Sequence, residues 1–413
     1  MSTKLKVTVI TFSLAILLFT LAGGFVNVSA SSNDGAYRQL SVYSEVLSRI
    51  RLEYVEEPNI AGVTDGALHG LLESLDANSS YLSAEEYKHY KAAMKNDGKA
   101  NIGATVSKRF GYADVVAIIP GGPAEKAGIE NSDIIESMEG KSTHDMSLAE
   151  IRSMLSGDVG STITVAVVRP RRAEPQKVVI TRDVVAIPPV NDKILADNVG
   201  YIQVDSFPEG KSKEIAAKIR DLQKQGVKKI VLDLRNSAGG LEPEGIATAN
   251  LFLDHGTITY LQGQKYPKQA FNADPTKDIT QLPVAVLVNR GTAGPAEIVA
   301  SAILENARGD VVGDKTFGDG SVQKLIEMPD NSALILSIAK YYSPGGKPIQ
   351  DVSVTPNHMV ADSTEDDGAA PDDEDQATPS EKPEDKKEEK LKSQPDDQLN
   401  KALEVLKNRE SKG

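Results

Sequence analysis

The sequence contains no cysteine and no tryptophan among its 413 residues, and aromatic residues make up only 5%. Without cysteine there can be no disulfide scaffold, no thiol nucleophile and no zinc or iron–sulfur site held by thiolates. Basic residues are outnumbered, with 46 Lys and Arg against 59 Asp and Glu, which gives a net charge of −13 at pH 7. Residues 361–413 hold 17 acidic and 9 basic residues, so −8 of this charge lies there. The remainder is near neutral and has no basic stripe, which argues against nucleic-acid binding.

Histidine is also scarce, and its spacing gives no support for a metal site. No two histidines are spaced three or four residues apart; the five are His69, His89, His144, His255 and His358. Residues 291–294 are glycine-containing but too short, and without lysine, for a phosphate-binding loop. We therefore expect no metal and no cofactor.

The first thirty residues have the features of an export signal. Lys4 and Lys6 precede an apolar stretch over 7–26, and the small residues of 28–30 suit cleavage after Ala30. About 20 apolar residues can also just span a bilayer, so an uncleaved anchor is the alternative. Either interpretation predicts an exported chain, in the periplasm or another extracytoplasmic location.

Residues 31–98 are predicted to be helical. Apolar residues over 37–54 are spaced for one face of a helix, and further helical patterns run over 63–75 and 84–95. We expect this region to pack or to form a homodimer rather than to catalyse.

Residues 99–172 change to short β-type runs separated by glycine- and proline-rich turns, with one helical stretch at 147–155. The segment Gly122–Ile129, followed by the run that begins at Asp133, resembles that of a PDZ domain. PDZ domains add a free peptide C-terminus as a strand and hold its carboxylate on backbone N–H groups. The resemblance places this carboxylate loop at Asn101, Ile102, Gly103 and Ala104. The alternative is a PDZ fold whose groove has only a structural role.

Residues 173–360 alternate between strand and helix patterns, which predicts an α/β core with mostly parallel central strands. The expected elements are strands at 199–206, 229–234 and 284–289 and helices at 211–225, 242–253 and 295–306. Active sites in such cores form where loops leave the strand ends, and two such loops, 236–240 and 290–294, are rich in glycine. Beyond residue 361, the composition of 362–389 predicts an acidic, disordered tail, with a possible short helix at 398–406.

The order of helical leader, PDZ-like domain and α/β core resembles the carboxyl-terminal processing proteases, also called tail-specific proteases. The matching segments are 70–82, 232–240, 286–289, 313–318 and 341–350. The resemblance implies a crotonase/ClpP-like protease core and peptide hydrolysis by a Ser/Lys dyad, with a glutamine four residues after the lysine. Backbone N–H groups of a glycine pair and of the residue after the nucleophile would stabilise the oxyanion.

Both members of that dyad are replaced in this sequence. The nucleophile position is Gly294, in Thr292–Glu297, and the base position is Asp319, in Phe317–Gln323. Their separation of 25 residues is that of the family, so the motifs cannot be realigned to recover the dyad. Pro295 occupies the position of an oxyanion donor and has no backbone N–H.

Three residues of the implied site are retained: Gly239 and Gly240 of the oxyanion loop, and Gln323. The sequence therefore predicts a pseudoprotease that binds protein C-termini, with an active protease relative as a further candidate partner. The alternative is an active serine-type endopeptidase that uses other residues. The candidates for such a rescue are Thr292, Ser321, Lys315 and Lys324.

Overall fold

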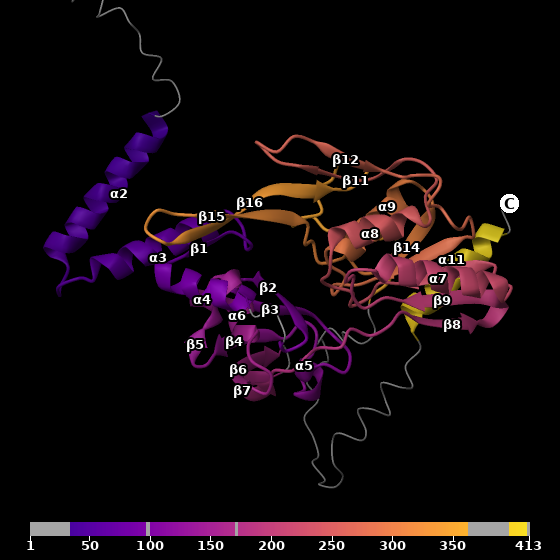
Figure 1. Ribbon diagram of the computed structural model, residues 1–413, viewed down its shortest axis with the longest axis horizontal. Helices are drawn as coiled ribbons and strands as arrows, with labels where there is room; N and C mark the ends of the chain where they lie inside the picture. The colour runs from indigo at the N-terminus through magenta and orange to yellow at the C-terminus, as the bar shows by residue number, and fades with distance from the viewer. Residues whose placement is uncertain (1–33, 96–99, 170–171, 362–395, 411–413) are drawn as a thin grey trace, which may run out of the picture. The chain divides into compact units, whose positions relative to one another are not determined.

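The computed structural model describes residues 34–95, 100–169, 172–361 and 396–410 (Figure 1). The predicted signal or anchor at 1–30 lies outside these residues, and so does most of the predicted acidic tail. The chain divides into two compact units, Met1–Ala67 and Leu68–Gly413.

The first unit contains α2 (Asp34–Glu53) and most of α3 (Ile60–Glu73). Several apolar side chains on α2 are exposed, among them Leu40, Val42, Tyr43 and Val46. In the part of the chain that the structure describes, no helix is long and apolar enough to cross a membrane.

The second unit begins with the end of α3, strand β1 (Ser80–Leu82) and helix α4 (Ala84–Lys95). Ser83 and Glu86 cap α4 reciprocally, since Ser83 N donates to Glu86 Oε2 at 2.8 Å and Glu86 N to Ser83 Oγ at 3.4 Å. Strand β1 pairs antiparallel with β16 (Ala333–Tyr342). The region predicted to be helical, 31–98, thus also contains β1, whose pairing partner lies about 250 residues away in the chain and leaves no local signal.

The PDZ-like sheet is antiparallel, in the order β2-β3-β4-β6-β7, with β5 paired to β4. Its strands are β2 (Ala104–Arg109), β3 (Tyr112–Ile118), β4 (Ile134–Met138), β5 (Lys141–Ser142), β6 (Thr162–Arg169) and β7 (Arg172–Thr181). Its helices are α5 (Pro123–Lys126), the 3-10 turn Thr143–Asp145 and α6 (Leu148–Leu155). The domain therefore continues to Thr181, beyond the predicted boundary at 172, because β7 returns along β6 as a hairpin.

A six-stranded sheet forms the centre of the α/β core, in the order β17-β14-β13-β10-β9-β8. Neighbouring strands are parallel except for β8 and β9, which confirms the predicted mostly parallel arrangement. The strands are β8 (Asn191–Leu195), β9 (Val199–Gln203), β10 (Lys229–Asp233), β13 (Val284–Val288), β14 (Gly309–Gly313) and β17 (His358–Met359). The 3-10 turn Ala196–Asn198 joins β8 to β9.

Helices α7 (Lys211–Lys224), α8 (Glu242–Asn250) and α9 (Pro295–Glu305) pack on one face of this sheet. Alternate residues of each strand supply the two faces, so Ile230 and Leu232 belong to the same buried cluster as residues of the three helices, while Val231 belongs to a cluster on the opposite side. A second, antiparallel sheet contains β11 (Thr257–Gln262), β12 (Gln269–Asn272), β15 (Ser321–Glu327), β16 and β1.

The C-terminal helix α11 (Asp397–Glu410) covers the opposite face of the parallel sheet, beside β10, β13 and β14 (Figure 1, yellow). Ala402 and Leu406 are fully buried there. Arg235 also binds Asp396 through two nitrogens, each at 2.9 Å. The helix is longer than the predicted 398–406, and it belongs to the core rather than to a flexible tail, because the face containing Val231 and Leu287 needs an apolar cover.

Candidate active site

The two glycine-rich loops follow adjacent parallel strands, β10 and β13, and are joined by reciprocal hydrogen bonds. The Asn289 amide donates to Asn236 Oδ1 and its own Oδ1 accepts from Asn236 N, both at 2.9 Å. Ala293 N also donates to the carbonyl of Ser237 at 2.9 Å. The predicted oxyanion loop and the predicted nucleophile loop are therefore held side by side.

Gly294 stands at the sharp turn before α9 with φ 63° and ψ −120°. A Cβ built there would find no atom nearer than the carbonyl oxygen of Asp319, at 3.9 Å. The structure therefore brings positions 294 and 319 together. It leaves room for a side chain at 294, but in a backbone conformation that only glycine adopts without strain.

Glu297, to which the sequence analysis gave no role, holds these two positions together. Its Oε2 accepts from Gly294 N at 3.0 Å and from Asp319 N at 2.8 Å. Its Oε1 accepts from Gly318 N at 2.8 Å and from the Thr316 hydroxyl. The side chain is fully buried, and burial raises the pKa of Glu297 to about 8 against the opposing effect of its hydrogen bonds. Its place three residues into α9, where a glutamate can bind the backbone N–H that precedes a helix, was the available sequence signal.

Asp319 carries a carboxylate without a close partner. Within the described residues it accepts no hydrogen bond and forms no ion pair, and the residue is half-buried. Burial raises the pKa of Asp319; the positive charge of Arg152 opposes this shift, and the negative charge of Asp351 adds to it. The site therefore places a carboxyl group, and no amine, where the base would be needed.

Gly239 and Gly240 both have positive φ, at 80° and 110°. A Cβ at Gly240 would lie 2.2 Å from the carbonyl oxygen of Phe207, so no other residue fits there without moving the backbone. The glycine pair keeps its tight turn, but Pro295 at the first position of α9 supplies no N–H for a second oxyanion donor.

A groove of about 620 Å³ connects this loop to the PDZ-like sheet. All four predicted carboxylate-loop residues, 101–104, line it together with Gly239, Gly240 and Asp319. Val116 and Ala117 of β3 pack directly against Ala238 and Ala293 of the two glycine-rich loops. The predicted peptide-binding residues and the predicted catalytic positions thus share one groove.

The groove's strand edge is partly occupied by the chain's own side chains. Strand β2 is an edge strand, the kind to which a peptide can be added. Asn101 Oδ1 accepts from the Gly103 backbone N–H at 2.7 Å, and the Arg152 guanidinium donates to the Val106 carbonyl at 3.1 and 3.3 Å. An added peptide strand has to compete with these contacts.

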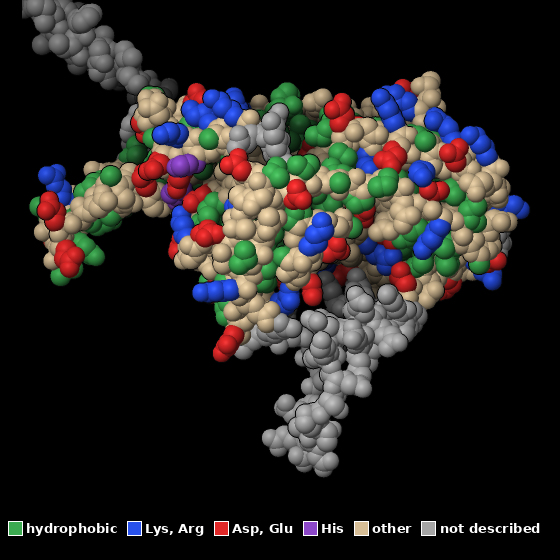
Figure 2. All heavy atoms as spheres, turned by 60° about the horizontal axis from the view of Figure 1, so that its bottom comes forward, with side chains coloured by type: hydrophobic (Ala, Val, Ile, Leu, Met, Phe, Trp, Pro, Cys, Tyr) green, Lys and Arg blue, Asp and Glu red, His purple; other side chains and the backbone are tan. Residues whose placement is uncertain are grey.

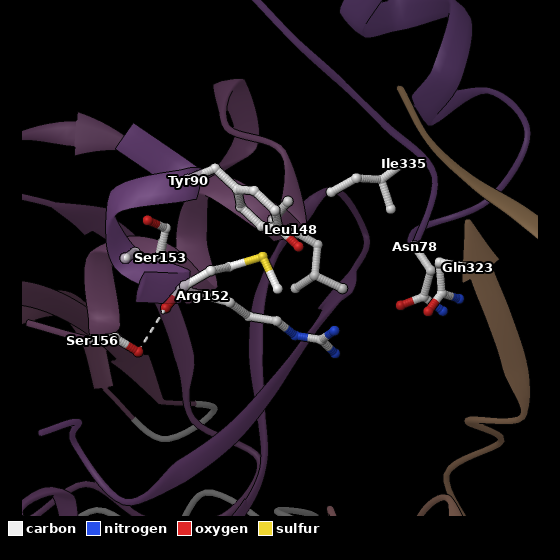
Figure 3. A pocket seen from close by; sticks show the side chains of 11 residues that line it. Asn78, Tyr90, Leu148, Arg152, Ser153, Ser156, Gln323 and Ile335 are labelled. Carbon is white, nitrogen blue, oxygen red and sulfur yellow. Dashed lines mark hydrogen bonds between the residues drawn. The ribbon is translucent and has the colours of Figure 1, made fainter. Parts of the chain in front are cut away.

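Gln323 lies away from Asp319, although the sequence predicts it as the residue that orients the base. Its side chain is exposed and donates to Ser321 Oγ at 2.7 Å, and no hydrogen bond joins it to Asp319 among the described residues. It lines a separate cavity of about 340 Å³, where Figure 3 shows the Arg152 guanidinium directed toward Asn78 and Gln323. The structure therefore does not bring the retained glutamine and the base position together.

The hydroxyl groups of the two candidate replacement nucleophiles, Thr292 and Ser321, already form other hydrogen bonds. The Thr292 hydroxyl is fully buried and donates to the Leu234 carbonyl at 2.7 Å, and Ser321 Oγ accepts from Asn78 and Gln323. Lys315 and Lys324 are exposed, and neither is hydrogen-bonded to these hydroxyls in the described part of the chain. Over residues 34–95, 100–169, 172–361 and 396–410, no group of acidic or histidine side chains is arranged to hold a metal.

The surface charge agrees with the near-neutral body inferred from the sequence. Figure 2 shows acidic and basic side chains interspersed over the face in view, without an extended patch of one sign. Nothing on this face suggests a polyanionic ligand.

Comparison with known proteins defines the class to which this fold and site belong. Residues 198–360 match the model of peptidase family S41, and residues 115–169 match a PDZ domain. The chain is 32% identical over 358 residues to a carboxy-terminal-processing protease of Bartonella bacilliformis, covering 83% of this chain and 82% of that protein. The chain therefore belongs to the S41 family of carboxyl-terminal processing proteases with a PDZ domain, and the predicted mixed α/β fold is confirmed.

Two further similarities agree with this family. A carboxy-terminal processing protease of Bacillus subtilis is 33% identical over 330 residues, covering 79% of this chain and 70% of that protein. Among solved structures, a photosystem II D1 C-terminal processing protease superimposes with a TM-score of 0.64 at 26% identity, covering 78% of this chain and 92% of that one.

Proposed function

We propose that this chain is an exported pseudoprotease, which binds protein C-termini but does not cut them. The observation that carries the proposal is that Gly294 and Asp319, at the positions of the family's nucleophile and base, lie close together in the structure. One has no side chain, and the other is a carboxylate that cannot act as the amine base of a Ser/Lys dyad.

The oxyanion site supports the same conclusion. Loss of one backbone or side-chain donor at such a site costs about 3 kcal/mol of transition-state stabilisation. Pro295 removes one donor here, so a nucleophile supplied by another residue would still face an incomplete site. Proline at the first position of a helix is well tolerated, which is why the fold keeps α9 intact.

The binding half of the proposal is supported by the shared groove. Its carboxylate loop, Asn101 to Ala104, lies beside an edge strand, the arrangement that peptide addition requires. A polypeptide entering there would extend toward Gly239 and Asp319 without meeting a nucleophile.

Location and assembly are part of the proposal. The basic and apolar character of residues 1–30 supports export to the periplasm or another extracytoplasmic space, either by a cleaved signal or by an anchor at 7–26. The exposed apolar side chains of α2 support a homodimer formed through the N-terminal helices. An active protease of the same family is a further candidate partner.

The second candidate function is an active serine-type endopeptidase that uses Thr292 or Ser321. It is the less favoured, because Thr292 is buried within a loop and Ser321 already accepts two hydrogen bonds.

A proteolysis assay separates the two functions. The chain beginning at Ser31 is incubated with an unfolded protein and with peptides that have free C-termini, and both cleavage and binding are measured. Peptide binding without cleavage supports the pseudoprotease. Cleavage that disappears in Thr292→Ala or Ser321→Ala would establish the endopeptidase instead.

A further inference from the structure

The part of the groove around Asp319 has properties that the loss of catalysis does not explain. Its carboxylate accepts no hydrogen bond and forms no ion pair among the described residues, although the residue is half-buried. Unpaired carboxylates in such surroundings are costly unless a cation compensates them.

Further negative charge lies nearby. Burial raises the pKa of Glu242, at the start of α8, and the negative charge of Asp319 adds to this shift. Asp351 acts on Asp319 in the same direction, although Lys340 lies 3.6 Å from Asp351 and offsets part of its charge. These acidic side chains favour a positive group beside Asp319, where Arg152 already supplies part of the compensating charge.

A buried hydroxyl on the same groove points independently to a ligand. Ser206 lines the groove together with Asp319 and Gly239. The residue is only 5% exposed, and its Oγ has no hydrogen-bond partner in the described part of the chain. Buried hydroxyls are nearly always hydrogen-bonded, so Ser206 has an unused acceptor and donor.

Space is available beside these groups. Gly294 contributes no side chain, and a Cβ there would meet nothing closer than 3.9 Å, the distance to the Asp319 carbonyl oxygen. Open volume therefore lies beside Asp319, which lines the groove of about 620 Å³ together with Ser206.

We propose that this volume is a subsite for a cationic side chain, lysine or arginine, of a peptide bound in the groove. The inference rests on the proposed function, because it names the class of C-terminal segment that the groove selects. The ligand's nitrogen donates to the Asp319 carboxylate and to Ser206 Oγ, and Glu242 adds long-range attraction. In the family's Ser/Lys dyad the enzyme supplies the lysine side chain. In this chain the bound peptide would supply the cationic side chain instead.

Arg152 is the internal competitor for this subsite. It lines the same groove, and its charge acts on Asp319 from the PDZ-like domain. Its guanidinium donates to the Val106 carbonyl, and within the described residues it forms no ion pair with Asp319. Its removal should therefore strengthen, rather than weaken, the binding of a cationic peptide.

Fluorescence anisotropy with labelled peptides tests the proposal on the chain beginning at Ser31. All peptides share one apolar free C-terminus, and a single lysine is moved along the upstream positions. Each lysine peptide is paired with the same peptide carrying norleucine or glutamate at that position. We expect lysine at one position to bind about tenfold more tightly than norleucine, and glutamate at that position to bind more weakly than norleucine.

Variants connect that preference to the named residues. Asp319→Asn should abolish it, Asp319→Glu should retain it, and Arg152→Gln should enlarge it. Asp145→Asn, which removes an exposed carboxylate outside the groove, is the matched control and should change nothing. Thermal unfolding of each variant establishes that it is folded. If Asp319→Asn does not fold, Asp319→Glu and Arg152→Gln still test the subsite.

Two results would overturn the subsite and can be told apart from failure of the proposed function. If lysine and norleucine peptides bind equally at every position, or the preference survives Asp319→Asn, the subsite is refuted while C-terminal binding stands. If no peptide of the set binds, C-terminal binding itself fails, and the subsite fails with it.

Discussion

The Glu297 carboxylate accepts a hydrogen bond from the Asp319 backbone N–H at 2.8 Å, and the same oxygen accepts one from Gly294 at 3.0 Å. One buried side chain thus links the two positions at which this chain departs from the family's dyad. The frame of an active site is preserved although the reactive groups are absent, which is what a protein that retains binding but not chemistry requires.

Replacing Glu297 by alanine should loosen this frame. Three backbone N–H groups and the Thr316 hydroxyl would be left without their acceptor in a buried site, at a cost of about 2–4 kcal/mol in the free energy of unfolding. Urea denaturation measures the loss. Glu209→Ala, at an exposed position, is the control and should stay within about 0.5 kcal/mol. An equally small effect for Glu297→Ala would show that water replaces the carboxylate.

Repair of the site should restore hydrolysis only in combination. Gly294→Ser alone should give no cleavage and should cost about 1–3 kcal/mol, because serine must adopt φ 63°. Gly66→Ser, where added atoms meet nothing and φ is helical, is the control and should be neutral or stabilising.

The triple variant Gly294→Ser, Pro295→Ala and Asp319→Lys should cleave unfolded protein, because nucleophile, base and oxyanion donor act as a unit. A folded but inert triple variant would mean that the site is altered beyond these three positions. The displaced Gln323 is then the first residue to reconsider, since it lies apart from position 319.

Stability should depend on pH through His69 and Glu86, whose side chains lie 3.2 Å apart. Its hydrogen bond to Glu86 raises the pKa of His69. Burial opposes ionisation of Glu86, but hydrogen bonds from His69 and Ser83 outweigh it and lower the pKa of Glu86 to about 2.

The two shifts act at opposite ends of the pH range. The contribution of His69 is complete below its ordinary pKa, 6.5, and is lost as the pH rises through its higher folded value. The contribution of Glu86 to stability is complete above about pH 4.5 and is lost as the pH falls toward 2. We expect this pair to stabilise the fold most between pH 4.5 and 6.5. Thermal unfolding across pH checks this, and His69→Gln should flatten the alkaline loss; an unchanged profile would contradict it.

The C-terminal helix should contribute strongly to stability. Leu406 is fully buried against the parallel sheet, so Leu406→Ala should cost about 2–5 kcal/mol. Glu404→Ala, on the exposed side of α11, is the control and should change stability little. A small effect of Leu406→Ala in urea denaturation would show that α11 is dispensable to the core.

Asn101 should limit peptide affinity. Asn101→Ala frees the Gly103 N–H, now bound at 2.7 Å, and should tighten binding of a free C-terminus several-fold in the anisotropy assay. Asp145→Asn, which lies outside the groove, is a suitable control. Weaker binding by Asn101→Ala would mean instead that the Asn101 amide contacts the peptide.

Local patterns in the sequence were sufficient for most of the α/β core. The helix expected at 295–306 is α9 at 295–305, and the strand expected at 284–289 is β13 at 284–288. Both segments are buried almost continuously, so an uninterrupted run of mostly apolar residues, bounded by turn residues, reveals them. The pairing of β1 with β16 has no such trace, because it depends on residues about 250 positions apart.

The sequence by itself determined which residues stand at positions 294, 295 and 319, and hence that no serine, no N–H and no lysine can be present there. Side-chain identity is a covalent fact that no fold can alter. Only the tertiary structure decided that Glu297 holds two of these positions together, that Gln323 lies apart from them, and that α11 completes the core. Those outcomes depend on which distant groups find hydrogen-bond partners and apolar cover, which is settled only when the whole chain packs.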